Sequence, residues 1–410
     1  MRLPRRGRSR RILRREEHSR RRLAGFALLG ALIVLPTIPI PPARAQNVGI
    51  EVTGKSEAIF DSAHDGCEPI DVPDVNPRAF RDEQGQVVVF ALHFINRALR
   101  GPDLDHLKLD CHVVLTSHFD ADPAHYDDRN YIAATWTSDG RNVTALVHHE
   151  YHADDHGRCD GKTGLACWYN SILAYRSRDG GANFGKDRPL VVASAPFGQQ
   201  AEQGRHRGFF NPSNIFSDGA YEYVFAATTG WDGQPHGACL LRTDRPADPA
   251  AWRAYDGHAF TIRYSDPYIS KAAATTKPCA PIGGFVFPVG AVVRERQSRQ
   301  WIAVFQAAKN DGAYPVDGFY YATSSDLLHW SEARLLMAGK TLFSDLCTAG
   351  PSVIAYPSLL DPKAKSRNFD DVGDGAYLYF TMIKVDHCET GQRLLMRQKI
   401  AIVTEPARRK

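Results

Sequence analysis

The stretch Ser177-Arg178-Asp179-Gly180-Gly181-Ala182-Asn183-Phe184 is a short acidic turn that ends in an aromatic residue, and similar turns recur along the chain. They run from Ser117 to Tyr126, from Thr243 to Trp252 and from Thr323 to Trp330, and a fifth repeat closes without one at Leu394 to Val403. Repeats of roughly 55–80 residues are units that cannot bury an apolar face alone. The pattern therefore predicts units that pack side by side.

Each repeat begins with two apolar strands separated by a polar turn, which is the pattern of a β-hairpin. The paired segments are 76–80 with 87–90, 131–136 with 143–147, 211–215 with 221–225, 287–293 with 301–305, and 356–360 with 377–380. Five hairpins in phase predict an all-β protein, a five-bladed β-propeller with any active site at its central channel. We expect the segment before Asp71 to close the ring by pairing with the strand near Leu394 to Val403, because closure protects exposed edges. The alternative is an irregular pair of β-sandwiches.

Residues 1–45 have the pattern of a cleaved export signal. Twelve arginines and two glutamates precede Gln46, an apolar run extends from Leu23 to Ile40, and Ala43-Arg44-Ala45 is a small-x-small cleavage site. Ser19-Arg20-Arg21-Arg22-Leu23 resembles the twin-arginine export signal. Glycines and prolines interrupt the apolar run, which is not typical of a transmembrane helix. We expect an exported protein, periplasmic or extracellular, without stable membrane insertion.

Removing this leader reverses the charge of the chain. The whole sequence has 50 Lys+Arg and 46 Asp+Glu, of which 12 and 2 lie in the leader, so that 38 and 44 remain. The remaining basic residues are scattered, which argues against a nucleic-acid partner. Residues 46–410 contain no Pro/Gly/Ser-rich linker, and about 365 residues are enough for one large core. We therefore expect a single domain.

All eight cysteines follow the leader, and an even number in an exported chain predicts disulfides. Their spacing lacks the Cys-x-x-Cys pairs of a structural zinc site. Cys159 with Cys167 would staple a loop in the second blade, and Cys239 with Cys279 would tie the third blade to the next. A free buried cysteine is the alternative for each, and the pairing of Cys67, Cys111, Cys347 and Cys388 stays open.

Two turns carry a resemblance to known families. Ser177 to Phe184 resembles the Asp-box of sialidase-type propellers, and Thr323 to Trp330 resembles the Ser/Thr-Ser-x-Asp-Leu-x-x-Trp turn of five-bladed propeller glycosidases such as arabinanases, xylosidases and invertase-like enzymes. In such turns the aspartate caps backbone N–H groups and the aromatic residue packs between blades. The resemblance implies a fold and, as an expectation, a glycosidase.

The resemblance also implies a catalytic aspartate at the start of the first blade. Asp71-Val72-Pro73-Asp74 occupies that place, with Asp74 the first candidate for a base or nucleophile and Asp71 the second. An Asx turn around Pro73 is the alternative. The Asn-Asp-Pro-Asn-Gly sequence of invertase-like enzymes is not found at this point, which argues against fructan cleavage. Asp361 is a further carboxylate to test.

The densest group of titratable residues is Leu146-Val147-His148-His149-Glu150-Tyr151-His152. Strand alternation would place His148, Glu150 and His152 on one face. A glutamate between two histidines suits a general acid, and a bound metal ion at these three residues or a polar blade edge are the alternatives. The spacing differs from the His-Glu-x-x-His zinc motif. No other cofactor is expected.

Substrate-binding candidates are more widely spread. We expect arginine, aromatic, amide and carboxylate side chains near the channel to bind substrate, together with His148 and His152: Arg78, Trp168, Asn211, Asn214, Trp231, Asp266 and Tyr356. For each aromatic residue, packing between blades is the alternative.

Three functions remain open on this basis. The first is an exported glycoside hydrolase that acts on a neutral sugar through Asp74 and Glu150, whose carboxyl groups should then lie about 5–10 Å apart. The second is a carbohydrate-binding or cell-envelope-binding propeller without catalysis. The third is a sialidase-like enzyme, which needs three convergent arginines, with Arg78, Arg242 and Arg397 as candidates, and a tyrosine nucleophile.

Overall fold

The computed structural model describes residues 47–159, 164–185, 190–198, 205–271, 276–310 and 312–405. The predicted export signal and its cleavage site lie outside the described residues. Residues Ala45–Lys410 form one compact unit. The described residues form strands and short 3-10 turns without an α-helix, which confirms the prediction of an all-β protein.

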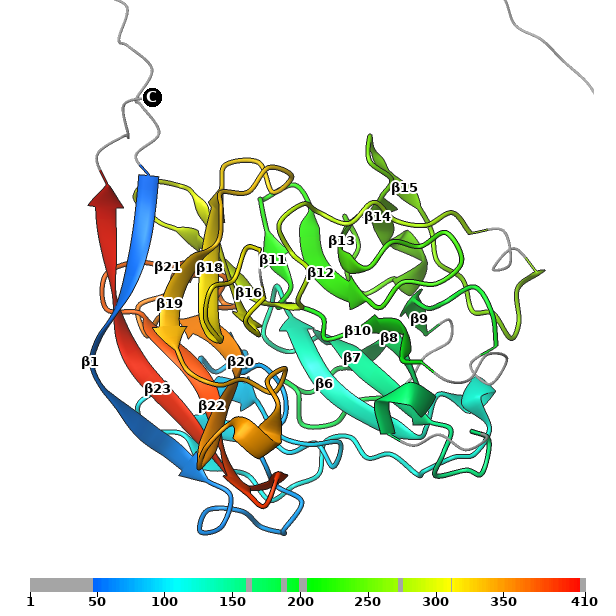
Figure 1. The fold of residues 1–410 in the computed structure, drawn as a ribbon, viewed down its shortest axis with the longest axis horizontal. Coiled ribbons are helices and arrows are strands. Elements are labelled where there is room, and N and C mark those ends of the chain that lie inside the picture. The colour runs from blue at the N-terminus through cyan, green and yellow to red at the C-terminus, as the bar shows by residue number, and fades with distance from the viewer. Residues whose placement is uncertain are drawn as a thin grey trace, which may run out of the picture. The chain divides into compact units, whose positions relative to one another are not determined.

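The described strands form four sheets, and the parallel contact between β8 and β10 divides the ten-stranded sheet into two groups, which makes five groups in all. Pairing within each group is antiparallel except between β16 and β21 (Figure 1). Group I contains β2 (Arg78–Arg81), β3 (Val87–Phe90), β4 (Leu99–Gly101) and β5 (Lys108–Leu109). Group II contains β6 (Arg129–Trp136), β7 (Val143–His152), β8 (Trp168–Ser177) and β9 (Val191–Ala193). Group III contains β10 (Arg207–Phe210), β11 (Phe216–Ser217), β12 (Glu222–Thr228), β13 (Gly237–Thr243), β14 (Arg253–Tyr255) and β15 (Phe260–Ile262).

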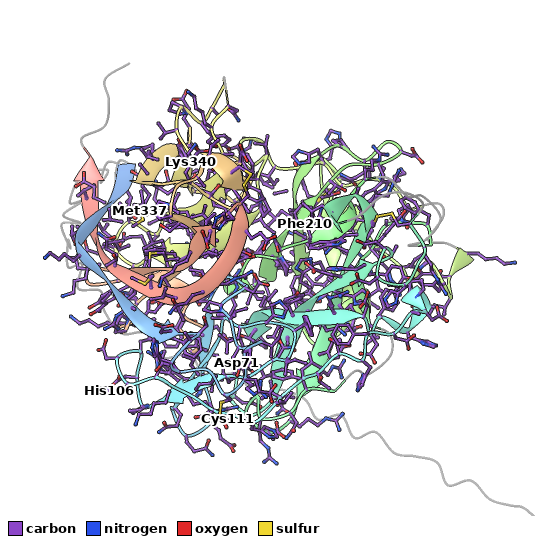
Figure 2. The ribbon with its side chains drawn as sticks, turned by 60° about the horizontal axis from the view of Figure 1, so that its bottom comes forward. Asp71, His106, Cys111, Phe210, Met337 and Lys340 are labelled. Carbon is purple, nitrogen blue, oxygen red and sulfur yellow. A yellow bond between two sulfur atoms is a disulfide. The ribbon has the colours of Figure 1, made fainter. Side chains whose placement is uncertain are left out.

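The last two groups complete the described strands. Group IV contains β16 (Val289–Glu295), β17 (Trp301–Ala307), β18 (Gly318–Ser324) and β19 (Arg334–Ala338), with β21 (Asp371–Val372) parallel to β16. Group V contains β20 (Ser352–Leu360), β22 (Tyr377–Asp386), β23 (Glu389–Glu405) and β1 (Asn47–Asp61). Met337 at the end of β19 and Lys340 just beyond it are labelled in Figure 2. Short 3-10 turns occur at Pro123–His125, Gly164–Cys167, Pro249–Ala251 and Leu346–Thr348.

The two ends of the described chain are joined in one sheet. Strand β1 pairs antiparallel with β23 over its length, from Asn47 opposite Glu405 to Asp61 opposite Leu394, and the two ribbons lie side by side in Figure 1. This pairing confirms the predicted closure between the segment before Asp71 and the C-terminal strand. Group III departs from a simple four-stranded plan, because β10 also pairs in parallel with β8 at Arg207 and Gly208.

Hydrophobic clusters join each group to the next in a closed order. Apolar residues of I and II pack together, as do those of II and III, III and IV, IV and V, and V and I. Representative pairs are Phe90 with Val147, Leu146 with Phe209, Phe225 with Phe305, Val304 with Phe380, and Leu395 with Val89. The fifth group thus packs on the first, which closes the series.

The quoted turns are built as the sequence predicts. Asp179 Oδ1 accepts the N–H groups of Ala182 at 3.1 Å and Asn183 at 3.0 Å, and Phe184 is buried against group I. Asp326 Oδ1 accepts two backbone N–H groups in the same way, and Trp330 packs on the cluster between groups III and IV. These turns end strands and hold an aromatic ring in the core.

One buried arginine contacts all five groups. Arg78 is 2 % exposed, and its five N–H groups donate to the carbonyls of Pro77, Ala133, Pro212 and Gly290 and to the hydroxyl of Ser358. Pro77 precedes β2, Ala133 lies in β6, Pro212 follows β10, Gly290 lies in β16, and Ser358 lies in β20. Burial lowers the pKa of Arg78 to about 9, so the guanidinium is charged at neutral pH.

The backbone is tight around this guanidinium. A Cβ at Gly290 would lie 2.4 Å from the carbonyl oxygen of Pro357 and 2.9 Å from Nδ2 of Asn76. Only glycine fits where two segments of the backbone approach so closely. Asn76 Nδ2 donates to Pro357 at 2.8 Å, which joins the start of group I to group V.

All four disulfides lie within the described residues. They join Cys67 to Cys111, Cys159 to Cys167, Cys239 to Cys279 and Cys347 to Cys388. The two predicted pairs are therefore confirmed, and the structure supplies the two that the sequence left open.

Replacing Arg78 with methionine should destabilise the protein by about 3 kcal/mol or more, because five buried acceptors lose their donor. The midpoint of urea unfolding measures the change. Arg245→Met is the matched control, since the Arg245 side chain is 67 % exposed and pairs only with surface aspartates. Equal midpoints for the two variants would contradict a structural role of Arg78.

Candidate active site

Strand β7 places three titratable side chains on one face. Glu150 Oε2 lies 3.0 Å from His152 Nε2, and Glu150 Oε1 lies 3.7 Å from His148 Nε2. All three side chains are buried. The alternation that the sequence predicts is therefore present, because residues two apart in a strand share a face. Burial favours the neutral acid, but hydrogen bonding to His152 holds the pKa of Glu150 below its usual value.

Asp74 is held by side chains from three parts of the chain. Its carboxylate forms an ion pair with Arg393 of β23, accepts the hydroxyl of Tyr356 at 3.0 Å and lies 3.1 Å from Nε2 of His93. Burial alone would raise the pKa of Asp74, but Arg393, His93 and Tyr356 together hold it below its usual value. Asp74 is therefore a carboxylate at neutral pH.

Aromatic rings connect the two carboxylates. The ring of Tyr131 lies 5.1 Å from that of His93 and 6.0 Å from that of His148. Burial raises the pKa of Tyr131 well above its ordinary value, and the charges of Glu150 and Asp74 raise this pKa further. The same two charges act on Tyr356. Tyr131 thus contacts both His93, a partner of Asp74, and His148, a neighbour of Glu150.

An asparagine fixes two neutral histidines beside Glu150. Asn170 Nδ2 donates to His148 Nε2 at 2.6 Å, and Asn170 Oδ1 accepts from His206 Nε2. Burial lowers the pKa of His148, and burial lowers the pKa of His206 to about 4. In this network His148 is neutral with its lone pair on Nε2, and His206 is neutral with its proton on Nε2.

Trp168 completes this side of the site. Its ring stacks on that of His152 with centroids 3.8 Å apart and an interplanar angle of 15°. The two residues face each other across the end of the β7–β8 hairpin. The disulfide between Cys159 and Cys167 closes the loop that joins them. The hairpin end is therefore tied at the point that carries the stack.

Six of the predicted site residues come together here: Asp74, His148, Glu150, His152, Trp168 and Tyr356. Tyr356 does so with a left-handed backbone, φ 57°, and its N–H donates to Gln306 Oε1. A bulky residue in this region is strained, and such strain is typical of functional sites.

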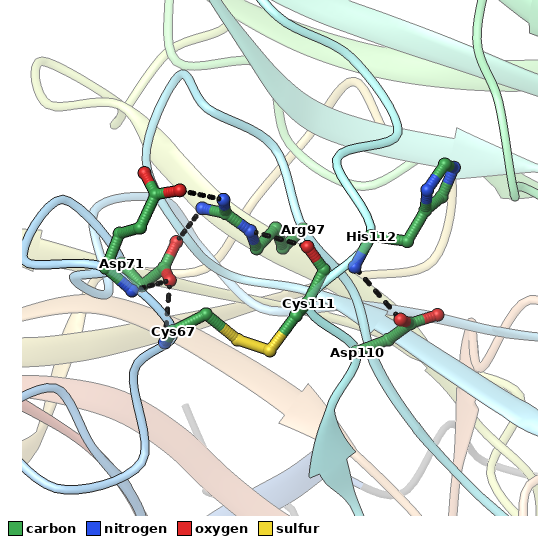
Figure 3. The surroundings of a disulfide bond; sticks show 7 residues. Cys67, Asp71, Arg97, Asp110, Cys111 and His112 are labelled. Atoms are coloured by element: carbon green, nitrogen blue, oxygen red, sulfur yellow. Dashed lines mark hydrogen bonds and ion pairs between the residues drawn. A yellow bond between two sulfur atoms is a disulfide. The ribbon is translucent and has the colours of Figure 1, made fainter.

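Asp71 has a different place from the one predicted. It is fully buried, accepts the N–H groups of Cys67 at 2.9 Å and Glu68 at 2.8 Å, and pairs with Arg97 at 2.6 Å (Figure 3). Arg97 also donates to the carbonyl of Cys111, the disulfide partner of Cys67. Asp71 and Cys111 are labelled in Figure 2. Asp71 therefore holds the disulfide-closed loop and has no free oxygen for catalysis.

Other predicted substrate-binding residues serve the fold. Every N–H group of Arg78 is used at the centre of the five groups. Asn214 bonds both the N–H and the carbonyl of Val292, linking groups III and IV. Trp231 is buried in the cluster between groups II and III, and Asp266 accepts the hydroxyl of Tyr126 and the N–H of Tyr268.

Asn211 keeps its predicted place near the site. It follows Phe210, whose ring lies 4.7 Å from that of His206, and it has a left-handed backbone with φ 44°. It remains a predicted binding residue.

Asp361, the further carboxylate candidate, and the arginines Arg242 and Arg397 have other partners. Asp361 is buried, pairs with Arg296 at 2.7 Å and accepts the N–H of Gly373. Arg242 lies over the ring of Tyr221, and Arg397 pairs with Glu57 and Asp105. The three arginines proposed for a sialidase-like site therefore do not converge.

Sequence reasoning missed His93, Tyr131, Asn170, His206 and Arg393. His93 follows the second strand of the first hairpin and Glu150 lies near the end of the second strand of the next, so aligning the repeats would have identified His93. Asn170 is opposite Glu150 in the β7–β8 register. Arg393 carries no local signal, because it reaches Asp74 only through the closure of the sheet by β1 and β23.

Within the described ranges, no group of three or more His, Cys, Asp or Glu side chains is arranged to hold a metal ion. A metal ion at His148, Glu150 and His152 stays a prediction.

No protein-family model and no curated protein matches this sequence. Solved structures with a similar arrangement include a thermostable family-43 glycoside hydrolase, with 11% identity, a TM-score of 0.43, and coverage of 83% of this chain and 96% of that chain. The Cellvibrio cellulosa alpha-L-arabinanase has 12% identity, a TM-score of 0.43, and coverage of 82% and 92%. A protein of unknown function from Dyadobacter fermentans has 9% identity, a TM-score of 0.46, and coverage of 86% and 99%. At such values a shared activity does not follow.

Asp71→Asn should destabilise the protein by about 3 kcal/mol, because it removes the charge that balances the buried Arg97. The midpoint of urea unfolding measures this loss. Glu68→Gln is the matched control, since Glu68 pairs with the same Arg97 but is 57% exposed, and it should cost less than about 1 kcal/mol. A stable Asp71→Asn variant would return Asp71 to the list of catalytic candidates.

Proposed function

We propose that the protein is an exported glycoside hydrolase that cleaves a neutral oligo- or polysaccharide. The observation that carries the proposal is the pair of largely buried carboxylates, Asp74 and Glu150, whose histidine neighbours His93 and His148 both contact the ring of Tyr131. Glycoside hydrolysis needs two carboxyl groups on opposite sides of one bond, and they arise here from neighbouring groups of strands. The acidic balance of residues 46–410 favours a neutral sugar over an acidic one.

Asp74 fits the role of base or nucleophile. Such a group must be ionised, and Arg393 stabilises the carboxylate. Its two oxygens are also oriented separately, since Oδ1 accepts from Tyr356 and Oδ2 faces His93. An oriented carboxylate loses little freedom when the sugar arrives.

Glu150 fits the role of general acid only when the site carries a further proton. Its lowered pKa means that Glu150 is ionised at neutral pH in the free protein. His152 lies within hydrogen-bond distance of Glu150. A proton taken up by the site is therefore shared between Glu150 and His152 and does not belong to either residue alone. The acid is therefore the Glu150–His152 pair, oriented by the stack on Trp168.

We infer that the five groups are the blades of a five-bladed β-propeller. The support is the closed order of hydrophobic clusters together with Arg78, which reaches the innermost part of every group. Asp74, Tyr356 and the end of β7 would then face the same end of the channel. The sequence pattern likewise predicts an active site at the central channel.

The cellular location is part of the proposal. Four disulfides within the described residues suit an oxidising compartment. Among those residues, no helix is long and apolar enough to cross a membrane. The leader sequence supplies the route of export.

A second function is favoured by one observation. Both carboxylates have a lowered pKa, so neither is a proton donor at neutral pH. A carbohydrate-binding propeller needs ionised hydrogen-bond acceptors and no acid, and the same site would serve it. The two functions differ in whether a glycosidic bond is broken.

Asp74→Asn and Glu150→Gln should each lower turnover by about 100-fold or more, the size expected when a positioned acid or base is lost. Turnover is measured by reducing-sugar release from arabinan, xylan, galactan and β-glucan. Asp386→Asn is the control, because its side chain is 89% exposed. Full activity in both site variants would refute the assignment, and a wild-type protein that binds a glycan but releases no sugar would establish the binding function.

The pH dependence should place maximal kcat/KM on the acid side of neutrality. Asp74 must be ionised, which holds at a pH above its lowered pKa, and Glu150 must be protonated, which is lost as the pH rises through the lowered pKa of Glu150. A pH–rate profile from pH 3 to 8 tests this expectation. Activity that persists unchanged at pH 7 would assign the proton to a donor outside the Glu150–His152 pair.

A further inference from the structure

Phe119 is a bulky residue that the fold keeps both strained and exposed. Its backbone is left-handed, φ 53°, and its side chain is 49% exposed. The other described aromatic and aliphatic residues with such a backbone are largely buried: Tyr126, Leu327, Tyr356 and Phe369. Burial of the ring offsets the strain at those positions, and Phe119 lacks that compensation.

The loop that carries Phe119 is fixed on both sides. The N–H groups of His118 and Asp120 both donate to the carbonyl of Asp127 at 3.1 Å, so that the residue between them projects outward. His118 also pairs with Asp127 at 2.7 Å, and His125 pairs with Asp120 at 2.7 Å. Phe119 is therefore presented on an ordered loop.

Phe119 adjoins the candidate active site through a chain of ring contacts. Its ring lies 5.2 Å from that of Phe94 at an angle of 89°, and the guanidinium of Arg129 lies over it at 5.2 Å. Phe94 in turn contacts His93 at 4.4 Å and Tyr131 at 5.8 Å. We call Phe94, Phe119 and Arg129 the Phe119 shelf. Because Arg129 covers one face of the Phe119 ring, the exposed half is the opposite face and the rim.

We propose that the Phe119 shelf binds one sugar ring of the substrate, next to the ring held between Asp74 and Glu150. This inference rests on the proposed function and extends it to a chain of at least two sugars. The apolar C–H face of a sugar ring packs well on a flat aromatic ring, and a rigid platform binds without an ordering cost.

A protein partner fits these observations less well. Stable protein interfaces bury on the order of 800 Å² on each side, whereas the shelf exposes a single ring. The other exposed large hydrophobic residues belong to other loops and strands: Leu165, Ile269, Val286, Val316, Leu335 and Phe343. The shelf therefore suits a small flat group.

Affinity gel electrophoresis through soluble arabinan, xylan, galactan and β-glucan tests the shelf without requiring turnover. Phe119→Asn removes the ring and suits the left-handed backbone, so the apparent affinity should fall roughly 5- to 10-fold without loss of thermal stability. Phe119→Tyr should keep wild-type affinity. Phe343→Asn is the matched control, because Phe343 is a 38% exposed phenylalanine outside the site, and its affinity should not change.

In the binding and stability measurements, four results would overturn the shelf: Phe119→Asn retarded like the wild type, Phe343→Asn weakened equally, a lower melting temperature for Phe119→Asn, or no glycan that retards the wild-type protein. The proposed hydrolase activity is tested by a separate result. Retardation that depends on Phe119, without sugar release from any glycan, would keep the shelf and refute catalysis. If the wild type is active, Phe119→Asn should raise KM for the polymer with little change in kcat, and an unchanged KM would refute the shelf.

Discussion

The guanidinium of Arg78 is the constraint around which the described strands are arranged. It is buried, charged, and bonded to four carbonyls and one hydroxyl from five separate parts of the chain. A buried charge is tolerated only when its donors are satisfied, so each group must present an acceptor at a fixed place. Gly290 shows how close this approach is, because no larger residue fits between its neighbours. The five segments that supply these acceptors are thereby set in position relative to one another.

The same arrangement brings the candidate site together from its separate parts. Asp74 precedes β2, whereas the side chains that hold it come from β23, β20 and the segment after β3. Strand β1 also contributes, because Ser62 just beyond its end accepts the N–H of Arg393. Closure of the sheet thus has an electrostatic consequence, since it delivers the cation that keeps Asp74 ionised.

Glu150 depends on a more local device. The β7–β8 hairpin sets His152 opposite Trp168 and Glu150 opposite Asn170, and the Cys159–Cys167 disulfide closes its end. Buried Asp128 accepts the N–H of His152 at 2.8 Å and lies 3.0 Å from His156, which anchors the last residue of the strand. The two carboxylates are therefore held in different ways. Asp74 depends on the long-range closure by β1 and β23, and Glu150 depends on the disulfide-closed β7–β8 hairpin.

The sequence by itself determined the all-β class, the hairpins, the capped turns, two disulfides and the shared face of His148, Glu150 and His152. These features depend on neighbours close in the chain, through strand alternation and turn hydrogen bonds. Only the tertiary structure decided which of Asp71 and Asp74 is structural, because Arg97 and Arg393 reach them from distant segments. It also decided that Arg78 belongs to the core, and it added His93, Tyr131 and His206 to the site. The reason is physical: the charge state and accessibility of a side chain depend on what packs against it, and local sequence does not specify those partners.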